Sequence, residues 1–484
     1  MNLLDGMKKN NTIKNTKGSD YYATTYNNNL DVFTMLTRYN SEKDIIELYE
    51  KALNENEEIA LANLLYILDI RSGKGERRLF KIIYKYLCLN HPNHALRVLP
   101  FISELGRYDY ILIGINTPIE KETIELIKKQ LEIDINEETP SLLAKWLPSH
   151  RTHNKNNKIA KKLIKELNMS EKEYRKMLSS LRTKLNIIEK NLTNKEYNNI
   201  DFSKVPSKAM IKYNEAYNRN MIEEYTKYKE SVAKGEKRIN TKGLFAYEII
   251  KKIITDKDCD SELYDLMWKN QKDILPNNNK NILVVADTSG SMTFHQAIPY
   301  CTSIGLAIYI AERNKGFFKN HFITFSEKPT LHEIKGNTIL DKVNSMETIN
   351  AWNTDIDKVF ELILKTATDN NLSQKELPEQ ILIISDMEFD KGVNSSTGTN
   401  FDNWKKSFKE AGYELPTIIF WNVAGSTRGV PVTKFENDVA MVSGFSTNIL
   451  NNLLDLKNYS PIDVMIEKLS LYLEMLKFDK YNIL

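Results

Sequence analysis

Apolar residues recur every three or four positions through most of the chain between Leu30 and Ile254, a spacing that places them on one face of an α-helix. Four such stretches cover residues 58–71, 75–89, 94–106 and 123–133, and short polar links separate them. Short amphipathic helices cannot bury their apolar faces alone, so we expect consecutive helices to stack. The pattern therefore predicts an all-α solenoid domain over residues 30–280.

The pattern changes beyond the segment "PNNNKN" (276–281), whose Pro and Asn run predicts a domain boundary. Short apolar runs follow, and helical spacing alternates with them. This alternation predicts an α/β domain over residues 281–484, with a doubly wound, mostly parallel sheet covered on both faces. The predicted strands cover 281–287, 321–326, 380–386 and 416–424, the helices between them 297–314, 355–369 and 403–412, and two closing helices 448–456 and 461–477.

The first 29 residues are polar and rich in Asn, and we expect a polar arm that is extended or disordered. The hydrophobic content of the whole chain, 41%, is ordinary for a folded, soluble protein. No run approaches a signal peptide or a membrane span. The three cysteines are widely spaced, which argues against a disulfide framework and a zinc site. We therefore expect a cytoplasmic protein without membrane contact.

Charge is distributed unevenly along the chain. Residues 145–242 contain 24 Lys or Arg against 11 Asp or Glu, a balance of +13, whereas the whole chain carries only +3. Such a segment is a candidate surface for a polyanion such as RNA, although solvated helix faces would have the same composition. The candidate RNA-binding residues are Lys145, Arg151, His153, Lys155, Lys158, Lys161, Lys162 and Lys165.

The last four of these lysines recur at three- and four-residue steps, which places them on one helical face. Aromatic residues follow at Tyr174, Tyr213, Tyr217 and Tyr225. They either stack on unpaired bases or belong to the core.

Hard oxygen donors gather where predicted strands end. Asp287, Ser289 and Ser291 follow the first strand, Asp386 follows the strand at 380–386, and Thr354 begins a predicted helix. Loops at the carboxyl ends of such strands meet at one edge of the sheet. Two carboxylates and three hydroxyls without His or Cys suit Mg²⁺, with Mn²⁺ or Ca²⁺ as alternatives.

Two other interpretations of these residues stay open. Asp287 and Ser289 can cap a helix, although capping does not explain Asp386 at a second strand end. The nearby acids Asp355, Asp357, Glu388 and Asp390 also allow a two-metal nuclease. No Ser/His/Asp or Cys/His set and no phosphate-binding loop motif is present. We therefore expect a binding protein rather than an enzyme.

The donor pattern resembles the metal-ion-dependent adhesion site of von Willebrand factor A domains, whose Asp-x-Ser-x-Ser, Thr and Asp residues it matches one by one. In that family these residues bind the metal directly or through water, and a partner's acidic group completes the coordination. The resemblance therefore implies that the α/β domain is an A domain with these five residues as metal ligands.

A helical half joined to an A domain resembles the TROVE family of the Ro ribonucleoprotein autoantigen, in which HEAT-like helices form a ring. Residues 67–87 and 142–150 are more similar still to uncharacterised TROVE-like proteins of viruses, bacteria and plants. The resemblance implies a non-catalytic ribonucleoprotein that binds small non-coding or misfolded RNA. The alternative is a protein-interaction scaffold that uses the metal site to bind a partner's carboxylate, without RNA.

Overall fold

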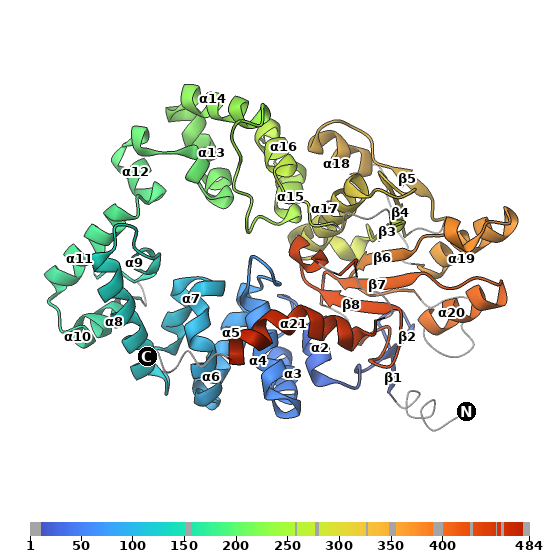
Figure 1. Cartoon of the computed structure of the whole chain (residues 1–484), viewed down its shortest axis with the longest axis horizontal. Coiled ribbons are helices and arrows are strands. Elements are labelled where there is room, and N and C mark those ends of the chain that lie inside the picture. Colours follow the sequence, from blue (N-terminus) through green and yellow to red (C-terminus); the bar gives the residue numbers. More distant parts are fainter. Residues whose placement is uncertain are drawn as a thin grey trace.

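The computed structural model describes residues 11–150, 156–256, 259–275, 280–325, 328–347, 355–390, 400–425, 429–451, 453–455 and 459–477. Helices dominate the chain up to residue 269, and a six-stranded sheet with flanking helices follows (Figure 1). The predicted order, a helical part and then an α/β part, is confirmed at this level. The exact domain boundaries stay a prediction, although the first strand of the sheet begins at Ile282.

The helical part consists of short helices joined by short links. Their bounds are α2 Asn28–Met35, α3 Glu42–Glu55, α4 Glu57–Leu68, α5 Arg77–Asn90, α6 Pro92–Val98, α7 Ile102–Leu105, α8 Glu120–Asn136, α9 Leu143–Trp146, α10 Asn156–Glu166, α11 Glu171–Lys184, α12 Ile188–Asn194, α13 Ser207–Asn220, α14 Ile222–Ala233, α15 Ala246–Thr255 and α16 Ser261–Lys269. Short 3-10 turns lie between some of them, at Leu99–Phe101, Tyr108–Gly114, Tyr197–Asn199 and Phe202–Lys204.

Local sequence explains where these helices begin and which faces they bury. Asn27, Ser41 and Asn56 precede α2, α3 and α4, and each side chain accepts a hydrogen bond from the backbone N–H three residues later. The residues of α4 from Ala60 to Leu68 are all buried, because α3, α5 and α21 pack around this helix. The helix α4 is therefore the centre of the first helical layer.

Gly73 and Gly75 turn the chain between α4 and α5. A Cβ atom at Gly73 would overlap the carbonyl oxygen of Tyr66, and Gly75 has a φ of +65°, which disfavours other residues. Between the two glycines the side chain of Lys74 is buried. Its Nζ donates to the Phe33 carbonyl at 2.5 Å and to Ser443 Oγ at 2.8 Å, which ties this turn to the α/β part.

The α/β part is built on one sheet with the strand order β5-β4-β3-β6-β7-β8. All neighbouring strands are parallel except β5, which is antiparallel to β4 at the edge. The strand bounds are β3 Ile282–Ala286, β4 His321–Thr324, β5 Leu331–Glu333, β6 Gln380–Ser385, β7 Thr417–Asn422 and β8 Val439–Ser443. Every residue of β3, β6 and β8 is buried, as expected for strands covered on both faces.

The helices of this part are α17 Ile298–Arg313, α18 Ile339–Glu347, α19 Asp357–Asp369, α20 Asn400–Glu410 and α21 Pro461–Lys477. The helix expected at 448–456 is wrong. A 3-10 turn, Thr447–Leu450, occupies its beginning, and turns follow at the described positions after it. One cause is tertiary: the amide of Asn448 donates to the Ile70 carbonyl of the helical part, 3.2 Å away. The strands β5 and β8 were not predicted. The strand β5 is short and exposed, whereas β8 has an apolar run, residues 439–442, that the sequence analysis missed.

The helical part forms an arc, and both of its ends pack on the α/β part (Figure 1). At the first end α4 packs against α21 and α2 against β8. At the other end α15 packs against α17 and α16 against α18. The chain therefore closes on itself as a ring of elements, with α8–α11 farthest from the sheet.

The polar segment near the N-terminus has a defined place in the described structure. The strands β1, Thr12–Lys14, and β2, Asp20–Tyr22, form an antiparallel hairpin. Its two tyrosines, Tyr21 and Tyr22, are buried. Tyr22 also exchanges two backbone hydrogen bonds with Val430, at 2.9 and 2.8 Å. The hairpin therefore belongs to the α/β part. The polar composition of this segment did not predict that placement.

Candidate metal centre

The two predicted aspartate ligands lie where the strand order reverses. Strands β3 and β6 are parallel neighbours, with Ala286 opposite Ile384. Asp287 and Asp386 follow the carboxyl ends of these strands, and the backbone N–H of Asp287 donates to the Ile384 carbonyl at 2.9 Å. Since successive connections leave this point in opposite directions, a crevice forms there in doubly wound sheets. Both carboxylates are buried, with 0% and 2% exposure.

Hydrogen bonds hold these side chains in position. Asp287 accepts from the backbone N–H of Ser289 at 2.9 Å and from Ser385 Oγ at 2.7 Å. Ser289 Oγ and Ser291 Oγ lie 3.0 Å apart. Asp386 accepts from the backbone N–H of Glu388 at 2.9 Å. Four of the five predicted donors are therefore on neighbouring loops, and Thr354 lies outside the described residues.

Electrostatics favour a cation at this position. Burial, followed by the negative charge of Asp386, raises the pKa of Asp287, while hydrogen bonds from Ser385 and Ser289 oppose the shift. Two buried carboxylates that repel each other are stabilised by a divalent cation between them. Within the described ranges no group of three or more His, Cys, Asp or Glu could hold a metal ion. The predicted donor set is of another kind, since it combines two carboxylates with serine hydroxyls.

The other acids near this centre have partners in the protein. Thr16 Oγ1 donates to Glu388 at 2.5 Å, and Trp404 Nε1 donates to Asp357 at 2.6 Å. Ion pairs join Lys17 to Asp390 at 3.6 Å and Lys358 to Asp355 at 3.8 Å. A second metal ion would have to displace these contacts, so they disfavour the two-metal alternative.

The N-terminal hairpin covers the loop that follows Asp386. Asn15 Nδ2 and Ser19 Oγ donate to the Phe389 carbonyl at 2.8 and 3.0 Å, and the Tyr21 hydroxyl donates to the Met387 carbonyl at 2.7 Å. Sequence reasoning missed this supporting role. The one signal was the Tyr21–Tyr22 pair, which is unusually apolar for a disordered segment.

The loop that follows the serines contacts both ends of the helical arc. His295 stacks on Tyr39 with ring centroids 3.8 Å apart, and Lys251 Nζ of α15 donates to Gln296 Oε1 at 3.0 Å. His295, Gln296 and the next residue all have positive φ values of 55–60°. Three consecutive non-glycine residues in this region carry strain that packing must offset. The candidate ligands are thus connected to the closure of the ring.

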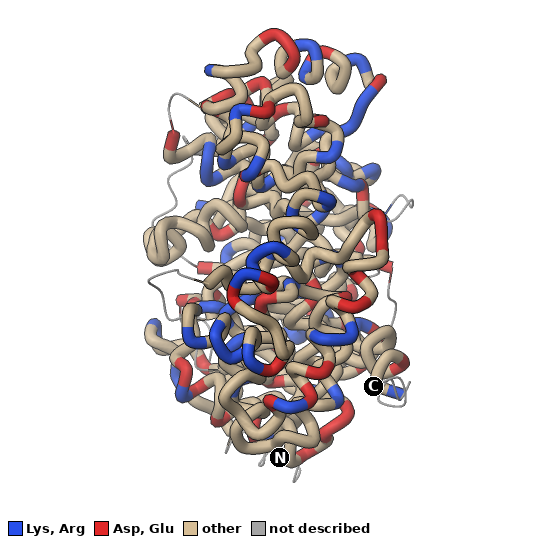
Figure 2. The backbone as a smooth tube through the Cα atoms, turned by 90° about the vertical axis from the view of Figure 1, so that its left-hand side faces the viewer, with Lys and Arg blue, Asp and Glu red and all other residues tan. Residues whose placement is uncertain are grey.

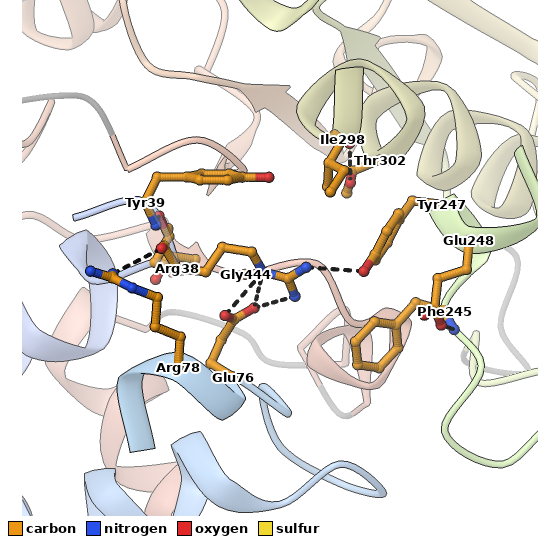
Figure 3. A network of polar contacts seen from close by, with 12 residues as sticks. Arg38, Tyr39, Glu76, Arg78, Phe245, Tyr247, Glu248, Ile298, Thr302 and Gly444 are labelled. Carbon is orange, nitrogen blue, oxygen red and sulfur yellow. Dashed lines mark hydrogen bonds and ion pairs between the residues drawn. The ribbon is translucent and has the colours of Figure 1, made fainter. Parts of the chain in front are cut away.

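A network of polar contacts is centred on Arg38 (Figure 3). Arg38 donates to both carboxylate oxygens of Glu76, with the shortest contact at 2.7 Å, and to the Tyr247 hydroxyl at 3.0 Å. Its guanidinium also lies 4.1 Å from the ring centroid of Phe445. Arg38 therefore joins the first helices, α15 and the loop after β8.

Only some of the candidate RNA-binding residues are exposed and without an ion pair among the described residues. On α10, Lys158, Lys161 and Lys165 are exposed, whereas Lys162 is paired with Glu120 at 2.5 Å. Lys145 lies 3.5 Å from Glu189. Arg151, His153 and Lys155 lie outside the described residues. Figure 2, which turns the α8–α11 side towards the viewer, shows Lys and Arg interspersed with Asp and Glu.

The aromatic candidates divide into core residues and one residue at the surface. Tyr174, Tyr217 and Tyr225 are fully buried, so the core interpretation holds for them. Tyr213 is half-buried, with Lys212 Nζ 4.7 Å from its ring centroid. Stacking on bases can therefore involve only Tyr213 of these four tyrosines.

Comparisons with known proteins describe the same two parts. A family model described as Domain of unknown function (DUF2828) matches residues 15–106 and 121–287, and another, Domain of unknown function (DUF7788), matches residues 281–470. The uncharacterized protein L728 of Acanthamoeba polyphaga mimivirus is 30% identical over 502 residues, which cover 94% of this chain and 86% of that protein. In the portion of the chain with described coordinates, no helix has both the length and the apolar character needed to cross a membrane.

Proposed function

The chain belongs to the DUF2828 family, and we propose that it is a non-catalytic RNA-binding protein of the Ro type with a Mg²⁺-binding A-domain-like part. The observation that carries this proposal is the closure of the helical arc, since both its ends pack on the α/β part. A HEAT-like ring closed by an A domain is what the resemblance to the TROVE family implies. Cys88, Cys259 and Cys301 form no disulfide in the described part of the chain, which supports a cytoplasmic location.

RNA binding through α10 rests on three side chains. Lys158, Lys161 and Lys165 are exposed and form no ion pair among the described residues. Apolar residues of the same helix, Ala160 and Leu163, are fully buried, so the helix presents its lysines on the outer face. Contacts of this kind are made to phosphates, depend strongly on salt and discriminate little between sequences. Small non-coding or misfolded RNA is the substrate class that fits.

The test is binding of a fluorescent single-stranded RNA by anisotropy over a range of salt concentrations. We expect the variant Lys158→Glu/Lys161→Glu/Lys165→Glu to weaken binding and to reduce the slope of log K against log salt by about 2, at about 0.7 per lost contact. The matched control reverses the three exposed lysines of α20, Lys405, Lys406 and Lys409. Equal losses in both variants would show a response to net charge alone and contradict the proposal.

The residues that would hold Mg²⁺ are Asp287, Ser289, Ser291 and Asp386, together with Thr354 by resemblance. Mg²⁺ bound by so few protein ligands keeps open positions, and there it would attract an acidic group of a ligand. The protein itself supplies the carboxylates, orients them through Ser385 and the loop amides, and excludes water by burial.

Metal binding is measured by titrating the full chain with Mn²⁺ and following its paramagnetic signal. We expect Asp287→Asn and Asp386→Asn to weaken binding at least about tenfold, since each removes a charged ligand. Asp357→Asn is the control, because this acid is partly buried in the same part of the chain but accepts a hydrogen bond from Trp404. Binding that is unchanged in the first two variants would refute the site without affecting the RNA test.

One observation favours the second candidate function, a protein scaffold. Phe294 follows the serine loop and is 69% exposed. An exposed aromatic ring beside an acid-binding metal suits a peptide ligand with an acidic and an apolar side chain. A pulldown with and without nuclease distinguishes the two functions: RNA-dependent partners are lost after nuclease, whereas a scaffold keeps its protein partner and loses it in Asp287→Asn.

A further inference from the structure

A cavity lies where the two ends of the helical arc meet the α/β part, and none of the candidate metal ligands lines it. Its volume is about 270 Å³, and four separate segments line it: the turn after α4, the segment before α15, the segment after α16 and the 3-10 turn Thr447–Leu450. Direct hydrogen bonds join these segments. Asn448 Nδ2 donates to the Ile70 carbonyl at 3.2 Å, and Thr241 Oγ1 donates to the Asn270 carbonyl at 2.9 Å.

The charge of the cavity wall is entirely positive. Arg71, Lys242 and Lys272 line it, and no Asp or Glu does so among the described residues. Four other cavities in the described part of the chain each include a carboxylate, from Glu379, Glu189, Glu224 and Glu361 respectively. The nearest acid in sequence, Asp273, accepts from the Leu275 backbone N–H at 3.1 Å and is not part of the wall. The charges of the wall therefore favour an anion over a cation.

A buried amide without partners provides an independent sign of a ligand. Gln271 is 9% exposed, and neither Nε2 nor Oε1 of its side chain has a hydrogen-bond partner among the described residues. An unsatisfied amide in such a position is costly, so native proteins rarely leave one without a ligand or water. Gln271 lines the same cavity as the three cations.

We propose that this cavity binds a small phosphate monoester. Three cations match a dianion better than a carboxylate. The Gln271 Nε2 would donate to a phosphate oxygen, and its Oε1 would accept from a hydroxyl group on the carbon part of the ligand. Arg71 is held in position, because its Nη1 donates to the Glu104 carbonyl at 2.8 Å, while its remaining donors suit phosphate geometry. The volume lies near the lower end of ligand pockets, which excludes large cofactors. The ring of Phe245 forms an apolar wall for the carbon part.

Such a ligand would also join the two ends of the helical arc to the α/β part. Arg71 comes from the first end, Lys242 and Lys272 come from the other, and Asn448 comes from the α/β part. A ligand that binds only the closed form stabilises that form, and the stabilisation grows with the logarithm of ligand concentration above Kd. We therefore expect a small phosphate ester to raise the unfolding temperature of the full chain.

The experiment is isothermal titration of the full chain with inorganic phosphate and, separately, with adenosine 5′-monophosphate, at fixed ionic strength in chloride buffer. We expect saturable binding that weakens about tenfold in Gln271→Leu and about a hundredfold in Lys242→Met/Lys272→Met. Both lysines are exposed, so the double variant keeps the fold even where the glutamine variant does not. Lys227→Met/Lys237→Met is the matched control, from a cavity that also contains Glu224, and it should bind like the unmodified chain.

Three outcomes overturn the proposal. The first is no saturable heat up to ~10 mM of either compound, which corresponds to water alone in the cavity. The second is binding that the Lys242→Met/Lys272→Met variant retains in full. The third is binding of a 5′-phosphorylated RNA without binding of either small phosphate, which would assign the positive wall to the nucleic acid. The Mn²⁺ titration and the RNA anisotropy assay test the proposed function, and their results do not depend on whether this cavity binds phosphate.

Discussion

The substitution Arg38→Met tests whether the buried network holds the ring closed. Arg38 makes a three-contact ion pair with Glu76, whose side chain is only 1% exposed. It also contacts Tyr247 of α15 and the ring of Phe445 after β8. Removing the arginine leaves a buried carboxylate without its cation and breaks one connection among three parts of the fold.

The expected loss of folding free energy follows from the difference in burial between Glu76 and Arg38. Removing one partner of a buried pair costs about 3–5 kcal/mol, and we expect the lower value, about 3 kcal/mol, because Arg38 is 21% exposed. The double variant Arg38→Met/Glu76→Gln should cost less than Arg38→Met alone, by about 1–2 kcal/mol, since the uncompensated charge is then absent. Glu76→Gln alone should cost less than Arg38→Met, because the arginine can still reach water.

The measurement is urea unfolding followed by circular dichroism, with the free energy of unfolding taken for each variant. The matched control is Arg97→Met, which breaks an arginine–glutamate pair of the same 2.7 Å length, to Glu58, at the surface. Exposed pairs contribute little, so we expect a loss of no more than about 0.5 kcal/mol. If Arg38→Met costs as little as this control, or if the double variant is the less stable, the network does not hold the ring closed.

Three further substitutions test the contacts between the parts. Gly425→Ala should destabilise the chain by about 1–3 kcal/mol in urea unfolding, because φ is +67° and the new Cβ would overlap Thr37 Oγ1 of the helical part. Burial lowers the pKa of Lys74 from 10.5 to about 7, so the folded chain releases this proton while the unfolded chain keeps it. The free energy of unfolding should therefore rise between pH 7 and 10 by up to about 1.4 kcal/mol per pH unit, and Lys74→Met should abolish that rise. Thr16→Val removes the 2.5 Å hydrogen bond to buried Glu388 and should lower stability by about 1.5–3 kcal/mol.

Matched positions control these comparisons. Gly412 also has a positive φ, of +84°, but a Cβ atom there meets nothing within 4 Å, so Gly412→Ala should cost less than Gly425→Ala. Thr366 donates to the Leu362 carbonyl on an exposed helix surface, and Thr366→Val should cost much less than Thr16→Val. A profile of stability against pH that is identical in Lys74→Met and in the unmodified chain would contradict the assignment to Lys74.

Periodicity identified the helices and strands that have a strong local pattern. The stretches at 58–71, 75–89 and 461–477 became α4, α5 and α21, and the runs at 281–287 and 380–386 became β3 and β6. The direction of a side chain follows from the period of the helix or strand. The buried face of such an element can therefore be predicted from a short stretch of sequence. The stretch at 94–106 was interrupted at Leu99–Phe101, where Pro100 breaks the helix.

Part of the candidate site could be predicted from the sequence for the same reason. An acid that directly follows an apolar parallel strand must stand at the carboxyl edge of the sheet, which placed Asp287 and Asp386 at one edge. Their proximity required the pairing of β3 with β6, segments almost one hundred residues apart. The partners that surround them, such as Thr16 on Glu388, are separated by 372 residues and left no local pattern.

The amino-acid sequence by itself determined the class of each half, the strands that carry the carboxylates and the basic face of α10, because these depend on neighbours within a few positions. Only the tertiary structure decided that the arc closes on the sheet, that the polar N-terminal segment docks beside the acids and that Glu120 pairs with Lys162. It also brought Arg71, Lys242, Gln271 and Lys272 to one cavity. These contacts join segments that are far apart in the sequence. They form because the fold as a whole buries the most apolar area in this arrangement, which no local pattern encodes.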